Sequence, residues 1–279
     1  MITEHTIIGR NILLNNKKAT ILPHQGWADF YSSNGLINYY SKIYEDLTIL
    51  VSDASRKEMI EQMFSQTPRI SCIIAPTYIG RKTSLDTCII CHTNHGDKIC
   101  PRVGTTPCRF VDYSLFSNNE YDNIKLGCFK NFEKWSLIRD RSNSFSHAFY
   151  EFELVDIRNR IDSFNISSVP QVQKPDGRYK VIHYDRERGI VIPEEILLKD
   201  RLQQIQLNNT SKIMIDQIEI LENAEELHFI DSNYSVMIYF LSFMNEKIAK
   251  IPKFLHAYTR FGRDTGIYRE PVPPNWYFL

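Results

Sequence analysis

The sequence shows no excess of either charge. Lysine plus arginine and aspartate plus glutamate each number 33, so the formal net charge is zero. Proteins that bind nucleic acid through its phosphates usually carry a basic excess or a basic stripe. The composition therefore gives no indication of a nucleic-acid partner.

Long apolar runs are absent as well. Residues 1–11 contain no apolar core of signal-peptide length, and no later stretch reaches the roughly 20 residues of a membrane-spanning helix. Without a secretion signal, the six cysteines indicate a reducing compartment and free thiols. We therefore expect a cytoplasmic protein with no membrane span.

The cysteine pattern lacks the second half of a typical zinc motif. Cys88 and Cys91 form a C-x2-C pair, which is a spacing that binds zinc. Four more potential ligands follow: His92, His95, Cys100 and Cys108. No second C-x2-C or H-x3-H pair is among them. Residues 87–92 also fit a buried strand in which cysteine is a small apolar residue. We prefer that interpretation and predict no metal site and no need for zinc in folding.

What the sequence does contain is a regular alternation of strands and helices. With 279 residues and 43% hydrophobic residues, the chain has room for two domains with substantial cores. The predicted elements of the first part are strand 19–22, helix 27–44, strand 47–51, helix 56–64 and strand 70–74. Residues 23–26 form a turn, and Ser52 or Asp53 caps the second helix. This order predicts a parallel sheet with crossover helices.

The same alternation returns after a linker. Residues 107–140 are irregular, and a helix is predicted to begin within 144–150. Residues 166–178 hold two prolines and one glycine among polar residues, which is typical of a linker. The elements predicted beyond it are strand 179–183, strand 204–207, a helix across 214–221, strand 226–230, helix 234–243 and a final strand 253–258. We predict an α/β protein with two Rossmann-like domains facing a cleft, 1–165 and 179–279.

The strongest candidate for a binding site is the turn after strand 226–230. Asp231, Ser232 and Asn233 follow this apolar strand and precede a helix that is apolar nearly all round. Ligands of parallel α/β sheets bind at the carboxyl ends of the strands, and a helix N-terminus there attracts phosphate. The turn through Tyr234 and Ser235 is our candidate phosphate site. Most turns of this kind only cap a helix.

A second polar turn follows strand 179–183. It contains Asp185, Arg186 and Arg188 after His183. The planar guanidinium of arginine pairs well with phosphate, although the same residues would also suit a solvated surface turn. We weigh the two interpretations equally.

Several of these stretches together resemble a known group of enzymes. Residues 22–30 with Asn34-Gly35-Leu36, and residues 181–186 with 221–232, resemble GT-B-type glycosyltransferases of large DNA viruses. Residues 145–164 look like the stretch that precedes the interdomain linker in that family. Within the family, the chain length and the Cys/His segment are most similar to chlorella-virus xylosyltransferases.

The resemblance implies a function for each domain. The C-terminal domain would bind a nucleotide-diphosphate sugar, a UDP-sugar such as UDP-xylose, and the N-terminal domain would bind an oligosaccharide or glycoprotein acceptor. Transfer would be inverting and metal-independent, in viral glycoprotein glycan synthesis in the host cytoplasm. Glu222 would hold hydroxyl groups of the ribose or the sugar, and Asp216 is the alternative residue for this role. The implied donor-binding residues are His183, Asp185, Arg186, Asn208, Glu222, Asp231, Ser232, Asn233, Tyr234 and Ser235.

The resemblance also implies a catalytic base on the acceptor side. Asp29 would deprotonate the acceptor hydroxyl, and His24 is the substitute candidate. An aspartate at a helix start is very often only a cap. The first turn departs from the family pattern next to Asp29, where it has Trp27-Ala28 in place of a second glycine. The implied acceptor-binding residues are Gly26, Trp27, His92 and His147.

Two other classes of function fit the same sequence. One is a non-catalytic protein that binds sugar nucleotides or glycans. The other is a different enzyme of the same architecture, such as a sugar-nucleotide epimerase or a phosphorylase. A binder releases no nucleotide from a donor sugar, and an epimerase interconverts donors without an acceptor.

Overall fold

The structure is a computed structural model of the chain. It divides into two compact units, Met1–Asn165 and Ile166–Leu279. The residues that it describes are 4–7, 10–13, 16–80, 87–92, 99–100, 104–116, 120–142, 145–167, 172–186, 189–198, 201–207, 214–256 and 272–279.

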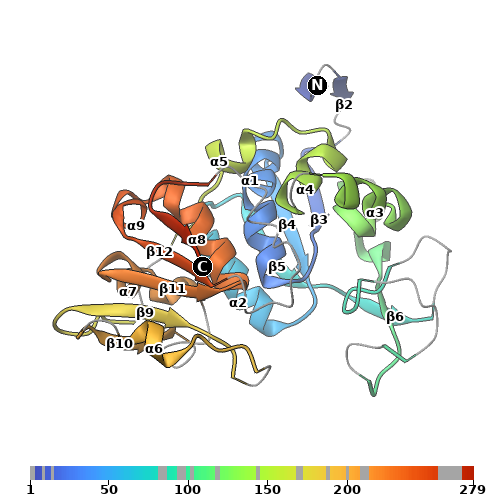
Figure 1. Ribbon diagram of the computed structural model, residues 1–279. Helices are drawn as coiled ribbons and strands as arrows, with labels where there is room; N and C mark the ends of the chain where they lie inside the picture. Colours follow the sequence, from blue (N-terminus) through green and yellow to red (C-terminus); the bar gives the residue numbers. More distant parts are fainter. Residues whose placement is uncertain are drawn as a thin grey trace. The chain divides into compact units, whose positions relative to one another are not determined.

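The first unit is built on a four-stranded parallel sheet (Figure 1). Its strands, in spatial order, are β5 (Ile70–Ile74), β4 (Asp46–Val51), β3 (Lys18–Leu22) and β8 (Tyr121–Lys125). The helices α1 (Trp27–Ile43) and α2 (Ala54–Met63) connect β3 to β4 and β4 to β5. The chain thus leaves β3 toward one side of the sheet and returns to β8 on the other. The carboxyl ends of β3 and β8 form a topological switch point, where ligands of such sheets bind.

Smaller elements complete this unit. Two antiparallel pairs, β1 with β2 and β6 with β7, stand apart from the main sheet. Helices α1 and α4 pack against each other, as do α3 and α4. The remaining elements are β1 (Glu4–Ile7), β2 (Arg10–Leu13), β6 (Thr77–Ile79), β7 (Arg109–Val111), η1 (Tyr113–Phe116), η2 (Gly127–Phe129), α3 (Phe132–Arg141), α4 (Phe145–Glu153) and α5 (Asn159–Asp162).

Helix α1 is buried on most of its circumference. Phe30, Tyr31, Leu36 and Ile37 are each fully buried, because the helix packs against β4, α4 and α5. At Gly35 the backbone of α5 comes so close that a Cβ atom would lie 2.2 Å from the carbonyl oxygen of Asn159. A glycine is therefore required in the middle of this helix, although glycine is a poor helix former.

The second unit contains a five-stranded sheet that is parallel throughout. Its strands, in spatial order, are β10 (Gln203–Gln206), β9 (Tyr179–His183), β11 (Glu226–Ile230), β12 (Lys253–His256) and β13 (Trp276–Phe278). Its helical elements are α6 (Glu194–Leu197), η4 (Met214–Gln217), α7 (Ile218–Glu222), α8 (Asn233–Met244) and α9 (Glu246–Lys250). Because β10 lies outside β9 and the later strands extend from β11, the switch point is between β9 and β11.

The predicted α/β class with parallel sheets is confirmed, and most predicted elements are present. Residues 87–92 do not form the expected strand. They form a turn in which the His92 N–H donates to the Cys88 carbonyl at 3.0 Å. Strand β8 and helix α3 lie in the region that the sequence left irregular. Strand 253–258 was expected to be the last, but β13 follows it; β12 ends at His256, and residues 257–258 lie outside the described residues.

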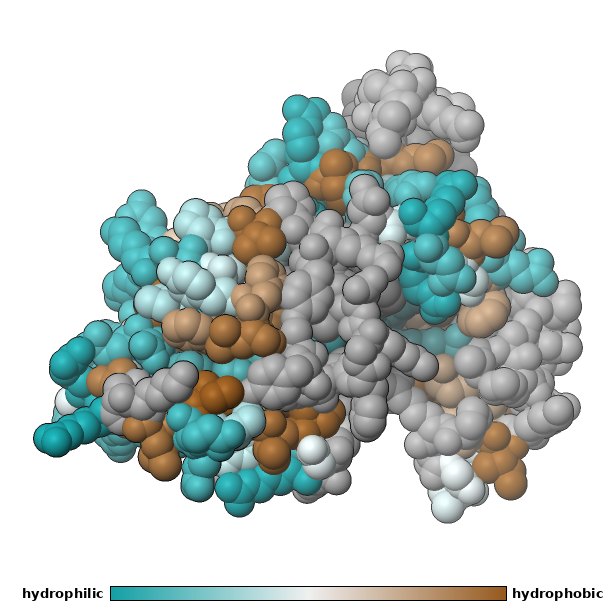
Figure 2. All heavy atoms as spheres, viewed as in Figure 1, coloured by the Kyte–Doolittle hydropathy of each residue, from teal (hydrophilic) through white to brown (hydrophobic). Residues whose placement is uncertain are grey.

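On the face that Figure 2 shows, hydrophilic and hydrophobic residues are mixed among the described residues. Ile79, Leu137 and Leu198 are large apolar residues that are at least 60% exposed, each on a different element or its end. Single exposed apolar residues are ordinary. Within the described ranges, no helix combines the length and the apolar character that crossing a membrane requires.

The contact at Gly35 generates a prediction about stability. Gly35→Ala adds a methyl group against the α5 backbone, and such overpacking costs about 1–3 kcal/mol. This cost should exceed the gain of about 1 kcal/mol in helix propensity. We expect urea denaturation to show a lower free energy of unfolding. The control is Ser55→Ala on the exposed face of α2, which should leave stability nearly unchanged. A Gly35→Ala variant as stable as the parent would contradict the close approach of α5.

Candidate functional site

Two loops meet at the switch point of the first unit, one after β3 and one after β8. The Leu126 N–H donates to the Leu22 carbonyl at 2.9 Å, which continues the pairing of the strands. Beyond them, the Cys128 N–H donates to His24 Nε2 at 2.9 Å. His24 is only 4% exposed. This buried imidazole therefore joins the two loops at the carboxyl edge of the sheet.

Aromatic side chains surround the His24 ring. Its centroid lies 4.8 Å from that of Trp135 on α3 and 4.9 Å from that of Phe149 on α4. Phe129 packs edge-on at 5.7 Å. The charged form of an imidazole is disfavoured in such an apolar setting. Burial, with smaller contributions from His92 and Arg139, holds the pKa of His24 well below its ordinary value.

Gly127 makes room for this imidazole. It has a positive φ of 53°, and a Cβ atom at this position would lie 2.5 Å from His24 Nε2. Both its backbone conformation and the close approach of the ring require a glycine. Gly127 was not among the predicted site residues. The sequence signal that could have indicated this loop is a glycine that directly follows residues 121–126.

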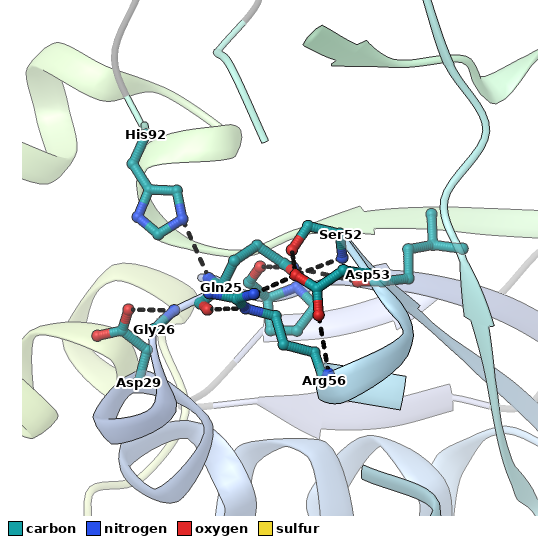
Figure 3. Close-up of polar contacts among 9 residues, drawn as sticks. Gln25, Gly26, Asp29, Ser52, Asp53, Arg56 and His92 are labelled. Atoms are coloured by element: carbon teal, nitrogen blue, oxygen red, sulfur yellow. Dashed lines mark hydrogen bonds and ion pairs between the residues drawn. The ribbon is translucent and has the colours of Figure 1, made fainter. Parts of the chain in front are cut away.

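Gln25 ties the end of β3 to the end of β4 (Figure 3). Its Nε2 donates to the carbonyls of Pro23 at 2.8 Å and Leu50 at 3.2 Å. Its Oε1 accepts from the Ser52 N–H at 2.8 Å. A buried amide with this many partners is fixed in position. Gln25 was not among the predicted site residues, because a single glutamine in a turn carries no recognisable pattern.

An arginine on α2 completes this edge. The Arg56 guanidinium donates to the Gln25 carbonyl and pairs with Asp53, the residue that caps α2. Burial alone would raise the pKa of the Asp53 carboxyl. Hydrogen bonds from the Arg56 N–H, the Ser52 hydroxyl and the Arg56 side chain outweigh burial and lower it. Asp53 is therefore ionised at neutral pH, and its pair with Arg56 lies directly beside the loop that carries Gly26.

Asp29 lies in the first turn of α1. Its Oδ2 accepts from the Gly26 N–H at 3.0 Å, as in a capping box. A Cβ atom on residue 26 would lie 2.5 Å from that oxygen, so Gly26 allows the carboxylate to approach its own loop. The carboxylate is half-buried, and one of its oxygens lies within 4.8 Å of ring nitrogens of both His24 and His92. Asp29 therefore caps the helix and also supplies the carboxylate of a small cluster with the imidazoles of His24 and His92.

His92 reaches this cluster from a distant part of the sequence. Its Nε2 accepts from the Gln25 N–H at 3.2 Å, and its ring centroid lies 5.4 Å from that of His24. His24 and His92 thus each use Nε2 to accept a backbone N–H. Two neutral imidazoles of this kind carry their proton on Nδ1. The geometry gives both rings a role in holding the loops around Asp29.

The other predicted acceptor residues, Trp27 and His147, lie on two helices of the same unit. Trp27 is the half-buried first residue of α1. His147 is on α4, one turn before Glu151, whose carboxylate pairs with Arg141 at 2.6 Å and accepts from the Ser142 hydroxyl at 3.0 Å. The α4 residue that packs against His24 is Phe149.

In the second unit, β9 and β11 are adjacent and parallel, with His183 opposite Phe229. The predicted turns therefore follow neighbouring strands at the same edge of one sheet. The ring centroid of His183 lies 4.3 Å from that of Tyr234 at the start of α8. The Tyr234 hydroxyl accepts from Gln217 Nε2 at 3.1 Å. These contacts join the end of β9, the connection before α7 and the start of α8.

The N-terminus of α8 is capped by its own serines. The Ser232 hydroxyl accepts from the Tyr234 N–H at 3.2 Å. The Ser235 hydroxyl accepts from the Ser232 N–H at 3.0 Å and donates to its carbonyl at 2.7 Å. Ser235 is fully buried, so its hydroxyl belongs to the cap. Asp231, Ser232 and Asn233 are half-buried and are the members of this turn that remain partly accessible.

A backbone bridge closes the turn after β9. The backbones of Asp185 and Ile190 exchange two hydrogen bonds of 2.8 Å, and Gly189 takes a positive φ of 70°. Arg186 is exposed, and its guanidinium carbon lies 5.2 Å from the centre of the Tyr184 ring. The cation–π contact and the fixed turn hold a positive charge beside the carboxyl ends of β9 and β11.

Glu222 must be removed from the predicted donor site. It ends α7, which leads into the amino end of β11, and its carboxylate accepts from Asn245 Nδ2 at 2.6 Å and pairs with Lys247 at 3.1 Å. Those partners follow the end of α8, whereas the candidate phosphate turn is at its start. Asp216 lies buried in η4 next to Gln217. Asn208 and Arg188 lie outside the described residues.

No family model matches the sequence, and no curated protein matches it. Among solved structures, the chain is similar to a glycosyl transferase family 9 protein from Veillonella parvula DSM 2008, with a TM-score of 0.46 and 9% sequence identity over 96% of this chain and 88% of that one. A TM-score and an identity this low establish neither a common fold nor a common activity.

The buried, neutral His24 generates a prediction about pH. Because its pKa in the folded protein is lowered from the ordinary 6.5, the unfolded chain binds this proton more readily. The stability that neutral His24 contributes is fully present above pH 6.5 and is lost progressively as the pH falls from 6.5 toward the lower pKa of the folded state. His24→Gln keeps an acceptor for the Cys128 N–H and does not titrate. We expect urea denaturation between pH 7.5 and pH 5.5 to show a smaller loss of stability for this variant than for the parent. Equal losses would contradict this interpretation of His24.

Proposed function

We propose that the protein is a glycosyltransferase that moves a monosaccharide from a nucleotide-diphosphate sugar to a hydroxyl group of a glycan. One observation carries this conclusion. In each unit, residues of the stretches that resemble GT-B-type enzymes lie at the switch point of a parallel sheet: the Asp29 loop after β3, and the turns of Arg186 and Ser232 after β9 and β11. Switch points are where sheets of this kind bind ligands.

The second unit is the proposed donor site. The N-terminus of α8 supplies backbone N–H groups and the positive end of a helix dipole, both of which favour a diphosphate. Ser232 and Asn233 are partly accessible there, and Arg186 supplies a full positive charge on the adjacent turn. A charge-assisted contact from its guanidinium would offset the charge that builds up on the leaving diphosphate.

The first unit is the proposed acceptor site. Asp29 is the proposed general base, because it combines a carboxylate with partial exposure, and His24 is buried with its Nε2 accepting the Cys128 N–H. In the reaction, Asp29 takes the proton of the acceptor hydroxyl while the oxygen forms a bond to the anomeric carbon. The bond from that carbon to the diphosphate breaks on the opposite face, and the nucleoside diphosphate leaves. The configuration at the carbon is inverted.

The finer assignments rest on the resemblance of residues 22–36, 181–186 and 221–232. They are a UDP-sugar as donor, xylose as the sugar, an oligosaccharide or glycoprotein as acceptor, and a role in viral glycan synthesis in the host cytoplasm. In the same way, the domain roles and the GT-B arrangement are part of the proposal. The protein donors around the diphosphate are proposed to act without a metal ion at the reaction centre.

A panel of donors separates this function from its competitors. The parent protein is incubated with UDP-sugars, including UDP-xylose, with and without a glycan acceptor, and released nucleotide and sugar products are measured. A glycosyltransferase releases nucleotide and forms a glycoside when an acceptor is present. An epimerase converts one donor into another without an acceptor, and a binding protein raises only its unfolding temperature. Either of these last two outcomes would overturn the proposed function.

The donor site is tested by removing the charge at its edge. Arg186→Ala should weaken the binding of UDP or of the donor by roughly tenfold to a hundredfold, since a hydrogen bond to a charged phosphate is lost. The matched control is Arg178→Ala, which removes an exposed arginine before β9, where it pairs with Glu225 at 3.0 Å. It should bind nucleotide as the parent does. Calorimetric titration that gives the same affinity for Arg186→Ala and the parent would contradict the donor site.

The acceptor site is tested through the proposed base. Asp29→Asn keeps an oxygen that can accept from the Gly26 N–H but lacks a basic group. We expect turnover to fall by roughly a hundredfold or more with donor affinity nearly unchanged. His24→Gln should retain far more turnover. If Asp29→Asn is as active as the parent, Asp29 is only a helix cap, and His24→Gln then shows whether the imidazole is the base.

A further inference from the structure

We propose that Cys88, Cys91, Cys100 and Cys108 bind a structural zinc ion. The four sulfur atoms lie within 4.8 Å of one another. Cys88, Cys100 and Cys108 are fully buried, and Cys91 is half-buried. Four thiolates converging on one point are a typical ligand set for structural zinc. This site is separate from the proposed transfer reaction and does not depend on it.

The spacing of the sulfur atoms suits tetrahedral zinc. Thiolate sulfurs at about 2.3 Å from a zinc ion stand about 3.8 Å apart at the corners of a tetrahedron. The Sγ atoms of Cys91 and Cys108 are 3.8 Å apart. A disulfide requires about 2.05 Å, and all six cysteines are free thiols. The cluster therefore has the size of a metal site and not that of paired disulfides.

The first pair of ligands is presented by a tight turn. The His92 N–H donates to the Cys88 carbonyl at 3.0 Å, and His92 takes a positive φ of 59°, which closes the turn after Cys91. Within the turn, the Ile90 N–H donates to Cys88 Sγ at 3.4 Å. Backbone donors to a ligand sulfur stabilise the thiolate form that zinc requires. The turn thus supplies both a geometry and a polarity that suit a metal.

The second pair is presented by a loop closed on itself. Ile99 and Pro107 form an antiparallel bridge, and the Cys100 N–H donates to the Thr106 carbonyl at 2.8 Å. Cys100 and Cys108 stand beside this bridge, one inside the loop and one just beyond it. The Ile89 N–H donates to the Arg109 carbonyl at 2.9 Å, which fastens the first turn to the strand after Cys108.

The apolar interior of this region is small. Among the described residues, its buried cluster consists of three of the thiols and Phe110, with Tyr78, Ile90 and Cys91 partly buried against it. Short, loop-rich segments with so little apolar surface are commonly stabilised by a metal ion or by disulfides. Zinc bound by four thiolates has no open coordination position, so the ion stabilises the fold and does not take part in catalysis. Binding releases the protons of the thiols that it deprotonates.

The zinc site also bears on the candidate acceptor site. Cys91 is followed directly by His92, whose Nε2 accepts the Gln25 N–H beside Asp29. A bound ion would fix the position of Cys91 and, with it, the approach of His92. The sequence alone favours a buried strand, because Cys100 and Cys108 are separated by seven residues and form no second C-x2-C pair. The turn and the closed loop reverse that interpretation.

The test is metal analysis of the full chain, produced in medium that contains zinc and purified without chelators. Elemental analysis should find about one zinc per chain. Cys88→Ser and Cys108→Ser should each lower the zinc content several-fold or more. The controls Cys72→Ser and Cys128→Ser replace buried thiols outside the cluster and should retain the ion. The proposal would be overturned if the parent protein contained no zinc, or if the Cys88→Ser and Cys108→Ser variants kept the zinc content of the parent.

A second measurement covers variants that fail to fold. Chelator is added to the parent protein, and released zinc and the unfolding temperature are followed together. Loss of the ion should lower the unfolding temperature. Refilling with Co²⁺ should give the thiolate-to-cobalt charge-transfer absorption and the visible bands of a tetrahedral sulfur site. Cobalt bound without sulfur absorption, or two disulfides found by thiol titration in denaturant, would contradict the site.

Discussion

The hydrogen bond from the Cys128 N–H to His24 Nε2 is the interaction on which the first unit's candidate site depends. It joins two loops whose bonded residues are 104 positions apart in the sequence. The imidazole can fill this role only while it is neutral and only if residue 127 has no side chain. Burial among aromatic rings satisfies the first condition, and Gly127 satisfies the second. With the loops joined, Gln25 and Gly26 have a fixed path, and the Asp29 carboxylate lies against it.

The local elements of the fold could be predicted because they depend on short-range patterns. Strands β3, β4, β5, β9 and β11 are apolar runs that end in turn-forming residues, and this signal survives in a single sequence. Strand β8 was missed because Tyr121–Lys125 is half-polar, and β13 because three residues after a proline-rich tail carry too little pattern. Their places in the sheets are set by pairing with β3 and β12, which is a long-range property.

In the candidate sites, too, the residues marked by local sequence patterns could be predicted and those defined by distant partners could not. The turn at Ser232 and the Asp29 loop could be predicted, since each directly follows a recognisable strand. Gln25, Gly127 and the Arg56–Asp53 pair could not, because their significance lies in partners far away in the sequence. Glu222 was misassigned for a related reason: a sequence does not show at which edge of a sheet a helix ends. The four cysteines were present in the sequence, but only folding shows that their sulfur atoms converge.

Strand β13 gives the second sheet a particular vulnerability. The Lys253 N–H donates to the Asn275 carbonyl and the Leu279 N–H to the Leu255 carbonyl, at 2.8 Å and 2.9 Å, so that the last residues cover one side of β12. The Trp276 ring anchors them through its Nε1, 3.3 Å from the Ser242 hydroxyl on α8. Without this short strand, β12 would present a row of unpaired backbone groups, which is the surface on which chains associate edge to edge. Losing the pairing of Trp276–Phe278 with β12 would therefore expose an edge of the second sheet to association between chains.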